Sequence, residues 1–359
     1  MMSLIIGLGV VLVVVSLYMI FRISNLVSLV REDKKSTGGN SANAALLLIF
    51  MIASLAAFGW YSYVHFDSYV LPVASEHGII TDNLFWVTMA ISVIAFVLIF
   101  IVLFWFTYKY RYHESRKAQF LPDNHILEAV WTIIPALVLA LLIFKGLGAW
   151  NEITGPASED AEVIEMIGQQ FAWTVRYPGV VDNELGQHNY KLIDPVNEFG
   201  LDLTDKNTFD DFKALELHLP KGKEVLLKIR AKDVLHSVFL PHFRVKMDAV
   251  PGMTTHFKFT PTKTTEDMRN ETGNPNFNYE LACTEICGKG HFSMRMLVVV
   301  EEQEDYEKWK ASQESWLKQN PEYLKRVPAA LRESAMIKAR IPLDEVSTMG
   351  SVQTVSISN

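Results

Sequence analysis

A short loop near residue 290 concentrates side chains that bind soft metal ions. Two thiols, an imidazole and a thioether fall within twelve residues, in Cys283-Thr-Glu-Ile-Cys287-Gly-Lys-Gly-His291-Phe-Ser-Met294. Both of the chain's two cysteines lie here. Sulfur and imidazole ligands select copper over magnesium or calcium. The spacing therefore predicts a copper-binding loop.

One more nitrogen is needed to complete such a site, and His236 is the candidate. It lies in Lys232-Asp-Val-Leu-His236-Ser, just past a predicted strand, and neighbouring strands that end at one rim would bring it to the loop. His242 is a second imidazole nearby, but Pro241 and Phe243 on either side of it favour a packing role.

Two cysteines favour a dinuclear centre. A mononuclear blue-copper site uses two histidines, one cysteine and a weak axial methionine. A second thiolate lets two coppers share two bridging sulfurs, so that the transferred electron is spread over both metals and bond lengths change little. The expected ligands are the side chains of His236, Cys283, Cys287, His291 and Met294 and the backbone carbonyl of Glu285.

Two other interpretations of the loop remain. A disulfide between Cys283 and Cys287 would explain the cysteines but would leave His291 and Met294 without a role. Zinc rarely takes a thioether, and structural zinc sites usually contain Cys-x2-Cys pairs. A copper site would use more of the loop's side chains than a disulfide or a zinc site would.

Four apolar runs precede the polar half of the chain and indicate a membrane protein. Hydrophobic residues make up 50% of the 359-residue sequence, which is high for a soluble chain. Each run reaches the ~20 residues that cross a hydrocarbon core of ~30 Å. The first could be a secretory signal, but its basic residues follow the run, which favours a retained helix. The predicted spans are residues 2–21, 44–63, 84–106 and 126–146.

Basic residues in the loops predict the orientation of these spans. The loops 22–43 and 107–125 each carry four Lys or Arg, whereas 64–83 carries none. Lys and Arg are retained on the cytoplasmic side during insertion. Both chain ends are therefore expected outside, with the polar half in the periplasm of a bacterial inner membrane.

Glu128 lies at the start of the last predicted span, in Leu127-Glu128-Ala-Val-Trp131-Thr-Ile-Ile-Pro135. A carboxylate at the edge of a membrane helix has two interpretations. The helix dipole can stabilise it, with Trp131 as an interfacial anchor and Pro135 as a tolerated kink. It can also take up protons from the cytoplasm for a partner subunit. The residues alone leave both open.

After Trp150 the sequence changes to short β-branched and aromatic runs separated by turn residues. Several strands at this spacing predict a sandwich or barrel. A helical tail is expected over residues 305–338, with breaks at Pro321 and Pro328, and a frayed end over 346–359. The predicted strands are residues 162–167, 171–177, 215–219, 224–231, 255–259, 278–282 and 296–301.

Residues 181–216 form an acidic insertion, with nine Asp or Glu against three Lys. We interpret it as a solvated loop, with a docking patch for a basic protein as the alternative. The net charge of −7 argues against nucleic acid as a partner. No Cys-x-x-Cys-His motif occurs, so no c-type haem is expected on this chain.

These motifs resemble those of subunit II of haem-copper cytochrome c oxidases, which carries a dinuclear CuA centre in a cupredoxin domain. The resemblance covers roughly residues 84–312, through the Glu128 motif, Asp233-Val-Leu-His-Ser, Lys246-Met-Asp-Ala-Val-Pro-Gly and the metal loop. It implies a transmembrane helical hairpin plus two extra N-terminal spans, an all-β cupredoxin-like Greek-key sandwich and a helical C-terminal tail. The implied domains are residues 1–83, 84–150, 151–312 and 313–359.

The resemblance also implies a function. Electrons would pass from a periplasmic cytochrome c through the copper centre to haem a in subunit I, which would hold CuB and reduce oxygen with proton pumping. Subunit III and membrane lipid would be further partners. Glu128 would be the entrance of a proton path into subunit I. The Glu285 carboxylate would reach a magnesium or manganese ion at the subunit interface.

Two features depart from the family pattern. Family members carry a tryptophan that receives the electron where this chain has Phe171. Trp173 would share a face with Phe171 by strand alternation, so it is the alternative residue for electron uptake, unless the donor docks elsewhere. The first two predicted spans lie outside the resemblance and are expected to bind another subunit or respiratory complex.

Three related classes of protein are less consistent with these residues. A copper carrier or assembly factor would need exchangeable, usually mononuclear coordination and no proton-path glutamate. Subunit II of a quinol oxidase keeps the fold but lacks the copper ligands. Nitrous oxide reductase shares the metal loop but is soluble.

Overall fold

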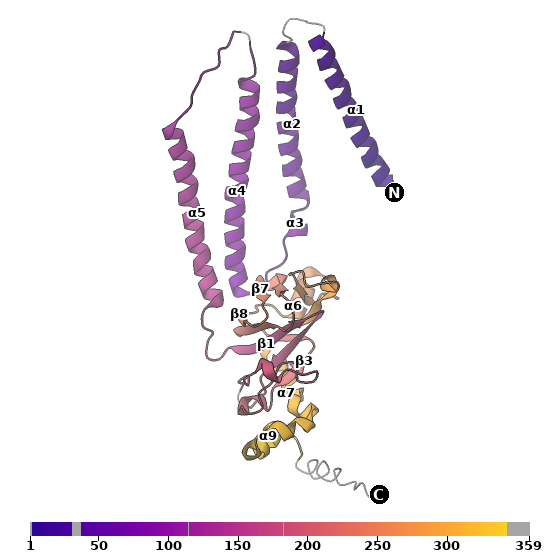
Figure 1. Cartoon of the computed structure of the whole chain (residues 1–359), viewed down its shortest axis with the longest axis vertical. Coiled ribbons are helices and arrows are strands. Elements are labelled where there is room, and N and C mark those ends of the chain that lie inside the picture. Colours follow the sequence, from indigo (N-terminus) through magenta and orange to yellow (C-terminus); the bar gives the residue numbers. More distant parts are fainter. Residues whose placement is uncertain (1, 31–36, 114, 182, 343–359) are drawn as a thin grey trace. The chain divides into compact units, whose positions relative to one another are not determined.

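The computed structural model describes residues 2–30, 37–113, 115–181 and 183–342. The chain divides into two compact units. Long helices make up the first unit, and the second is built on β-strands (Figure 1). The first unit comprises Met1–Val70 and Trp86–Leu137, and the second comprises Leu71–Phe85 and Val138–Asn359.

Three described stretches are long and apolar enough to cross a membrane, namely Gly39–Val64, Glu76–Lys109 and His125–Thr154. They contain the last three predicted spans. The first predicted span falls in α1, where the apolar stretch among the described residues is the shorter Val11–Ser24. A fourth span therefore stays a prediction. The helices are α1 (Met2–Val30), α2 (Thr37–Val64), α3 (Phe66–Tyr69), α4 (Glu76–Lys109) and α5 (His125–Thr154).

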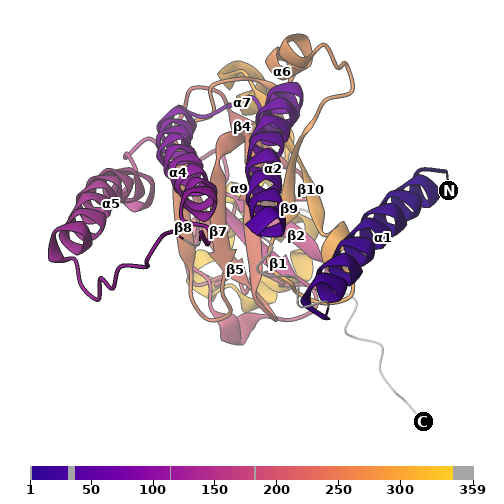
Figure 2. The ribbon, with the colours of Figure 1, turned by 90° about the horizontal axis from the view of Figure 1, so that it is seen from above.

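Within the first unit, α2 packs along α4 (Figures 1 and 2). Phenylalanines bridge the two helices, with ring centroids 5.7 Å apart for Phe50 and Phe104 and 5.9 Å apart for Phe58 and Phe96. Helix α2, which contains the second predicted span, therefore joins α4 and α5 as a helix of this chain's membrane anchor. Buried and half-buried residues recur at helical spacing, at Ala44, Leu48, Met51 and Leu55 of α2 and Val93, Val97, Phe100, Phe104 and Tyr108 of α4.

The second unit contains a sandwich of two five-stranded sheets. One has the order β3-β2-β1-β5-β8 and the other β4-β10-β9-β6-β7. The pairs β1–β5 and β4–β10 are parallel and the others antiparallel. The strands are β1 (Glu162–Gln169), β2 (Ala172–Tyr177), β3 (Phe212–Ala214), β4 (Leu217–Pro220), β5 (Val225–Ala231), β6 (His236–Leu240), β7 (Val245–Ala249), β8 (Thr255–Phe259), β9 (Tyr279–Cys283) and β10 (Arg295–Glu301).

The all-β sandwich predicted from the sequence is confirmed. All the predicted strands are present, as β1, β2, β4, β5, β8, β9 and β10. Strands β3, β6 and β7 were not predicted. Four of the five residues of β6 are buried, on both of its faces, so the strand lacks the alternation that marks a half-exposed strand.

The segment Leu71–Phe85 belongs to the β-rich unit although it precedes the sandwich by many residues. Ala74 and Ser75 are fully buried, and Ser75 Oγ donates to the Phe243 carbonyl at 2.7 Å. Arg244 binds Asp82 through two bonds of 2.6 and 2.9 Å. The first turns of α4 are therefore fixed to the sandwich by burial and by a bidentate ion pair.

The acidic insertion forms a second core with the C-terminal tail, so our prediction of a solvated loop is wrong. The insertion contains η1 (Tyr190–Leu192), η2 (Lys206–Thr208) and β3. The tail contains α7 (Gln303–Ser312), α8 (Trp316–Gln319), η5 (Pro321–Arg326), η6 (Ala329–Leu331) and α9 (Arg332–Lys338). The second core consists of Ile167, Phe199, Leu201, Leu203, Phe209, Trp316, Leu317, Tyr323, Leu324, Val327, Ala335, Ala339 and Ile341.

The predicted helical tail is confirmed. Its helices are interrupted near both predicted breaks, since η5 begins at Pro321 and η6 follows Pro328. The frayed end predicted for residues 346–359 lies outside the described residues.

Carboxylates of the insertion bind basic and hydroxyl groups of this tail. Asp194 accepts a hydrogen bond from Tyr323 at 2.7 Å and pairs with Arg326 at 3.0 Å. Lys338 pairs with Asp210 at 2.9 Å, and both side chains are largely buried. The chain's own tail is therefore the basic partner of these carboxylates.

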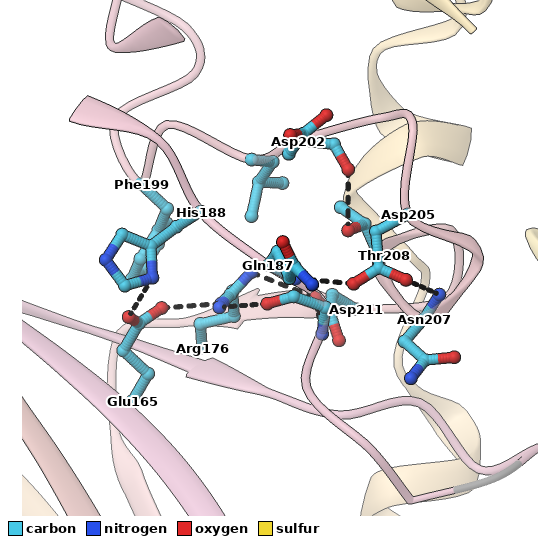
Figure 3. A network of polar contacts seen from close by, with 12 residues as sticks. Glu165, Arg176, Gln187, His188, Phe199, Asp202, Asp205, Asn207, Thr208 and Asp211 are labelled. Atoms are coloured by element: carbon cyan, nitrogen blue, oxygen red, sulfur yellow. Dashed lines mark hydrogen bonds and ion pairs between the residues drawn. The ribbon is translucent and has the colours of Figure 1, made fainter. Parts of the chain in front are cut away.

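A buried ion network fastens the insertion to the first sheet (Figure 3). Glu165 contacts Arg176 at 2.7 Å, Arg230 at 2.6 Å and His188 at 3.5 Å, and Arg176 also binds Asp211 at 3.0 Å. Burial would raise the pKa of Glu165, but attraction to the two arginines outweighs it and lowers that pKa. Burial raises the pKa of Asp211 to about 7, despite Arg176.

Candidate metal centre

The predicted ligands converge at one edge of the second sheet. Strand β6 begins at His236 and β9 ends at Cys283, and these strands pair antiparallel, so the two ends lie together. The chain then passes through Cys287 and η4 (His291–Ser293) and enters β10 after Met294. Strand pairing thus assembles residues that are distant in sequence.

The two thiols lie side by side without a covalent bond. Cys283 and Cys287 are both free and buried, and their sulfurs are 3.9 Å apart. A disulfide sulfur pair lies about 2.05 Å apart. The structure therefore does not contain the disulfide that the sequence left as an alternative.

Each sulfur has one imidazole and one weaker donor beside it. The sulfur of Cys283 lies 3.8 Å from His236 Nδ1 and 3.3 Å from the Glu285 carbonyl oxygen. The sulfur of Cys287 lies 3.7 Å from His291 Nδ1 and 3.8 Å from Met294 Sδ. The donors thus form two matching halves about the sulfur pair.

The donor set fits a soft cation. His236, Cys283 and Cys287 have ligand atoms within 4.8 Å of one another and are all buried, and no other such group of three occurs in the described part of the chain. Burial, together with Cys283, raises the pKa of Cys287 to about 11. Metal binding requires deprotonated thiols, so a bound cation would offset the cost of two adjacent buried thiolates. Copper suits two sulfurs, two imidazoles and a thioether.

Asp233 and Gln170 hold the candidate ligands in place, and we did not predict either residue. Asp233 Oδ1 lies 2.9 Å from His236 Nε2, so the imidazole can donate there and present Nδ1 to the sulfur. The backbone N–H of Gln170 donates to Asp233 Oδ2 at 2.7 Å, and its side-chain amide donates to the Cys287 carbonyl at 2.5 Å. A carboxylate three residues before a candidate histidine ligand was the available sequence signal.

Phe171 and Trp173 occupy different environments. Phe171 lies in the turn between β1 and β2, is 38% exposed and packs on the metal loop, where a Cβ added to Gly290 would lie 2.5 Å from its ring. Trp173 is buried, with its ring centroid 5.8 Å from that of His236. Phe171 and Trp173 therefore do not share a strand face as predicted, because Phe171 lies outside both strands.

The side chains of the remaining candidates are not among the described donors around the sulfur pair. Glu285 is half-buried, and its carbonyl rather than its carboxylate faces the sulfur. Glu128 lies in the first turn of α5, where its carboxylate is 3.3 Å from His125 Nδ1. His242 packs edge-on against Phe277 and Tyr279, as its neighbours suggested.

Fold and site together define a membrane-anchored β-sandwich protein with a buried site for a soft metal. The chain matches the family model of the cytochrome c oxidase subunit II periplasmic domain over residues 162–302. It matches the model of the subunit II transmembrane domain over residues 62–148. The second match begins upstream of the expected limit at residue 84, and α1 and most of α2 lie outside both.

Curated relatives agree with the family models. The chain is 35% identical to alternative cytochrome c oxidase subunit 2 of Bradyrhizobium diazoefficiens, over 68% of this chain and 84% of that protein. It is 28% identical to cytochrome c oxidase subunit 2 of Thermostichus vulcanus, over 66% of this chain and 76% of that protein. The crystal structure of the CoxB periplasmic domain of Bradyrhizobium japonicum covers 43% of this chain and 93% of the crystallised chain, at 22% identity and a TM-score of 0.29.

The chain belongs to the cytochrome c oxidase subunit II family, and this assignment rests on the sequence matches. It is accordingly a membrane protein with a cupredoxin-like domain and a subunit of a haem-copper oxidase.

Proposed function

We propose that this chain is the subunit through which electrons enter the oxidase, by way of a dinuclear CuA centre. The donor is a periplasmic cytochrome c, and the acceptor is haem a in subunit I, where oxygen is reduced to water with proton pumping. A copper pair supplies a one-electron carrier with low reorganisation. His236, Cys283, Cys287, His291, Met294 and the Glu285 carbonyl would hold it.

The arrangement of the donors in two halves is the observation that carries this proposal. Each cysteine sulfur has its own imidazole within 3.8 Å and its own weaker donor, a carbonyl for Cys283 and a thioether for Cys287. A mononuclear site would need only one such set. Two sets that share a sulfur pair suit two metal ions.

Phe171 is the proposed contact with the electron donor, because it is partly exposed and packs on the metal loop. Trp173 is buried beside His236, which suits a role inside the protein better than one in docking. Replacing Phe171 with leucine should slow reduction by the donor while leaving copper spectra unchanged. Unaltered reduction would exclude this role for Phe171.

The Glu285 side chain is proposed to reach a magnesium or manganese ion held with subunit I. Only its carbonyl faces the sulfur, so the carboxylate is available for a second ion. Glu285→Ala should remove the manganese signal of the assembled oxidase and leave the copper signal. Retention of the manganese signal would contradict the proposal.

Glu128 is proposed as the entrance of a proton path into subunit I. Its side chain is 48% exposed at the start of a membrane-length helix, with His125 beside it. Glu128→Ala should slow turnover of the assembled complex without changing copper spectra. Unchanged turnover would leave Glu128 with the helix-dipole role alone.

The charge of the loops supports a location in a bacterial inner membrane with the sandwich on the periplasmic side. Subunit III is a further expected neighbour. The two N-terminal helices, α1 and α2, are proposed to contact another subunit or respiratory complex. Helix α2 also packs on α4, and most of its surface stays exposed.

The decisive experiment loads the full-length chain with copper in detergent and records its electron paramagnetic resonance spectrum. We expect a mixed-valence signal spread over two equivalent coppers. His242→Gln is the matched control, because His242 is a largely buried histidine outside the cluster, and it should keep the signal. A signal from a single copper would overturn the dinuclear assignment.

A further inference from the structure

The connection between α4 and α5 combines exposed apolar and basic side chains. Phe120 is 91% exposed and Leu121 is 77% exposed, in an otherwise polar stretch. Four basic residues precede them, against Glu114 and Asp123 in the sequence. The basic residues are Lys109, Arg111, Arg116 and Lys117.

Both ends of this connection are held by the helices. The Arg116 side chain donates to the Lys109 carbonyl, and Arg111 donates to the Tyr108 carbonyl at 2.8 Å, so two arginines satisfy carbonyls at the end of α4. At the other end, Asn124 accepts from the backbone of Leu127 at 3.0 Å and caps α5. The exposed apolar pair lies between two fixed points.

The start of α2 also holds the connection. Asn40 Nδ2 donates to the Tyr112 carbonyl at 3.2 Å, and Arg111 Nε donates to Ser41 Oγ at 3.4 Å. These contacts tie the connection to the ends of membrane-length helices. In a bilayer crossed by these helices, a connection held there would lie at the depth of the lipid headgroups.

We propose that this connection is a lipid-binding surface for anionic phospholipids. Phe120 and Leu121 insert among the acyl chains next to the headgroups, as apolar groups on surface-bound segments do. The ammonium groups of Lys109 and Lys117 bind the headgroup phosphates. Lys117 is exposed and makes no hydrogen bond or ion pair with the described residues, so its ammonium group is accessible to a headgroup.

The first test measures insertion directly. In the full-length chain with Cys283→Ser and Cys287→Ser, a new cysteine is unique and can carry a fluorescent label. Phe120→Cys is compared with Leu215→Cys, which replaces a leucine that is 73% exposed in the β-rich unit. In nanodiscs, nitroxide-labelled lipid should quench the label at 120 several-fold more than the label at 215, and acrylamide should do the reverse.

The second test leaves the metal centre intact and measures headgroup selectivity. Lys109→Gln with Lys117→Gln should weaken the preference for phosphatidylglycerol over phosphatidylcholine by about fivefold per lysine, as native mass spectrometry of the full chain would measure. Lys325→Gln on the exposed surface of the tail is the control and should change nothing. Equal lipid retention by both variants would overturn the proposal.

A protein contact would be distinguished by the same label. Protection of residue 120 from acrylamide only after subunit I is added, with no quenching by nitroxide lipid, would mean that a protein covers Phe120 and Leu121. That result would also overturn the proposal. Quenching by lipid in the isolated chain supports it.

Discussion

The carboxylate of Asp233 controls how His236 presents its imidazole to the sulfur pair. Asp233→Asn keeps the size of the side chain but removes the charge that holds the Nε2 proton. We expect copper affinity to fall about 10–100-fold, as for other partners of ligating histidines. Competition with a copper chelator would measure it.

Asp248→Asn is the matched control for Asp233. Asp248 lies on the neighbouring strand and binds the Ser237 hydroxyl at 2.7 Å without contacting a proposed ligand. Its replacement should leave copper affinity unchanged. If both variants lose copper equally, the effect is one of general charge and not of imidazole orientation.

Gly290 makes room for Phe171 on the metal loop. A methyl group at this position would meet the ring at 2.5 Å, so Gly290→Ala should destabilise the protein by about 1–3 kcal/mol through overpacking. Phe171→Ala in the same chain should recover part of that loss. Thermal unfolding of the single and double variants measures the coupling, and additive losses would show that the contact is unimportant.

At this scale the sequence predicted which soft-donor side chains lie together, but it did not predict the residues that hold them in place. The cysteine, histidine and methionine positions were recognisable because few other residues bind soft metals. Gln170 was not recognisable, since its role depends on a turn that places it against both Asp233 and the Cys287 carbonyl. An amide in a turn has no distinctive spacing.

Among the elements, the attachment of the insertion to the first sheet includes one carboxyl group with a strongly shifted pKa, that of Asp211, which pairs with Arg176. The pKa of Asp211 is about 7 in the folded protein and near 3.8 ordinarily. Its contribution to stability is therefore complete below about pH 4 and is lost as pH rises through about 7. His188, whose pKa is lowered by burial, contributes in the opposite sense.

Asp211→Asn should remove this pH dependence. Stability of the wild type relative to the variant should fall between pH 4 and pH 7, by an amount on the order of 1–4 kcal/mol. Denaturant unfolding of the full chain at a series of pH values gives the difference, in which the His188 contribution cancels. A difference that rises with pH would contradict the assignment.

The insertion also shows why the sequence misled us about this element. Its nine acidic residues suggested solvent exposure, but Asp210 and Asp211 are buried against Lys338 and Arg176. The burial of Asp210 depends on its pairing with Lys338, which lies more than 100 residues away in the sequence. Hydrophobic residues such as Phe199 and Phe209 were present, but their spacing follows neither a strand nor a helix.

Across the whole molecule, the bidentate pair of Asp82 and Arg244 joins the start of α4 to the sandwich. Asp82→Asn should cost about 1.5 kcal/mol, because it replaces charge-assisted bonds with neutral ones. Hydrogen exchange of residues 71–85 should rise with it. Asp67→Asn in α3 is the control, and equal exchange in both variants would exclude the role of the pair.

The overall organisation was largely predictable because long apolar runs and strand patterns are local signals. Span lengths followed from hydropathy, and the sandwich followed from alternation. What local signals could not give was the packing of α2 on α4 or the membership of Ala74 and Ser75 in the core of the sandwich. Both depend on contacts between separate segments.

The placement of Leu71–Phe85 has a practical consequence for expression of a water-soluble fragment. A fragment beginning at Trp150 would omit Ala74 and Ser75, exposing the surface they cover and leaving the Phe243 carbonyl without its hydroxyl donor. It would aggregate or load copper poorly for reasons unrelated to its ligands. Fusing residues 71–85 to the fragment through a flexible linker would restore these contacts.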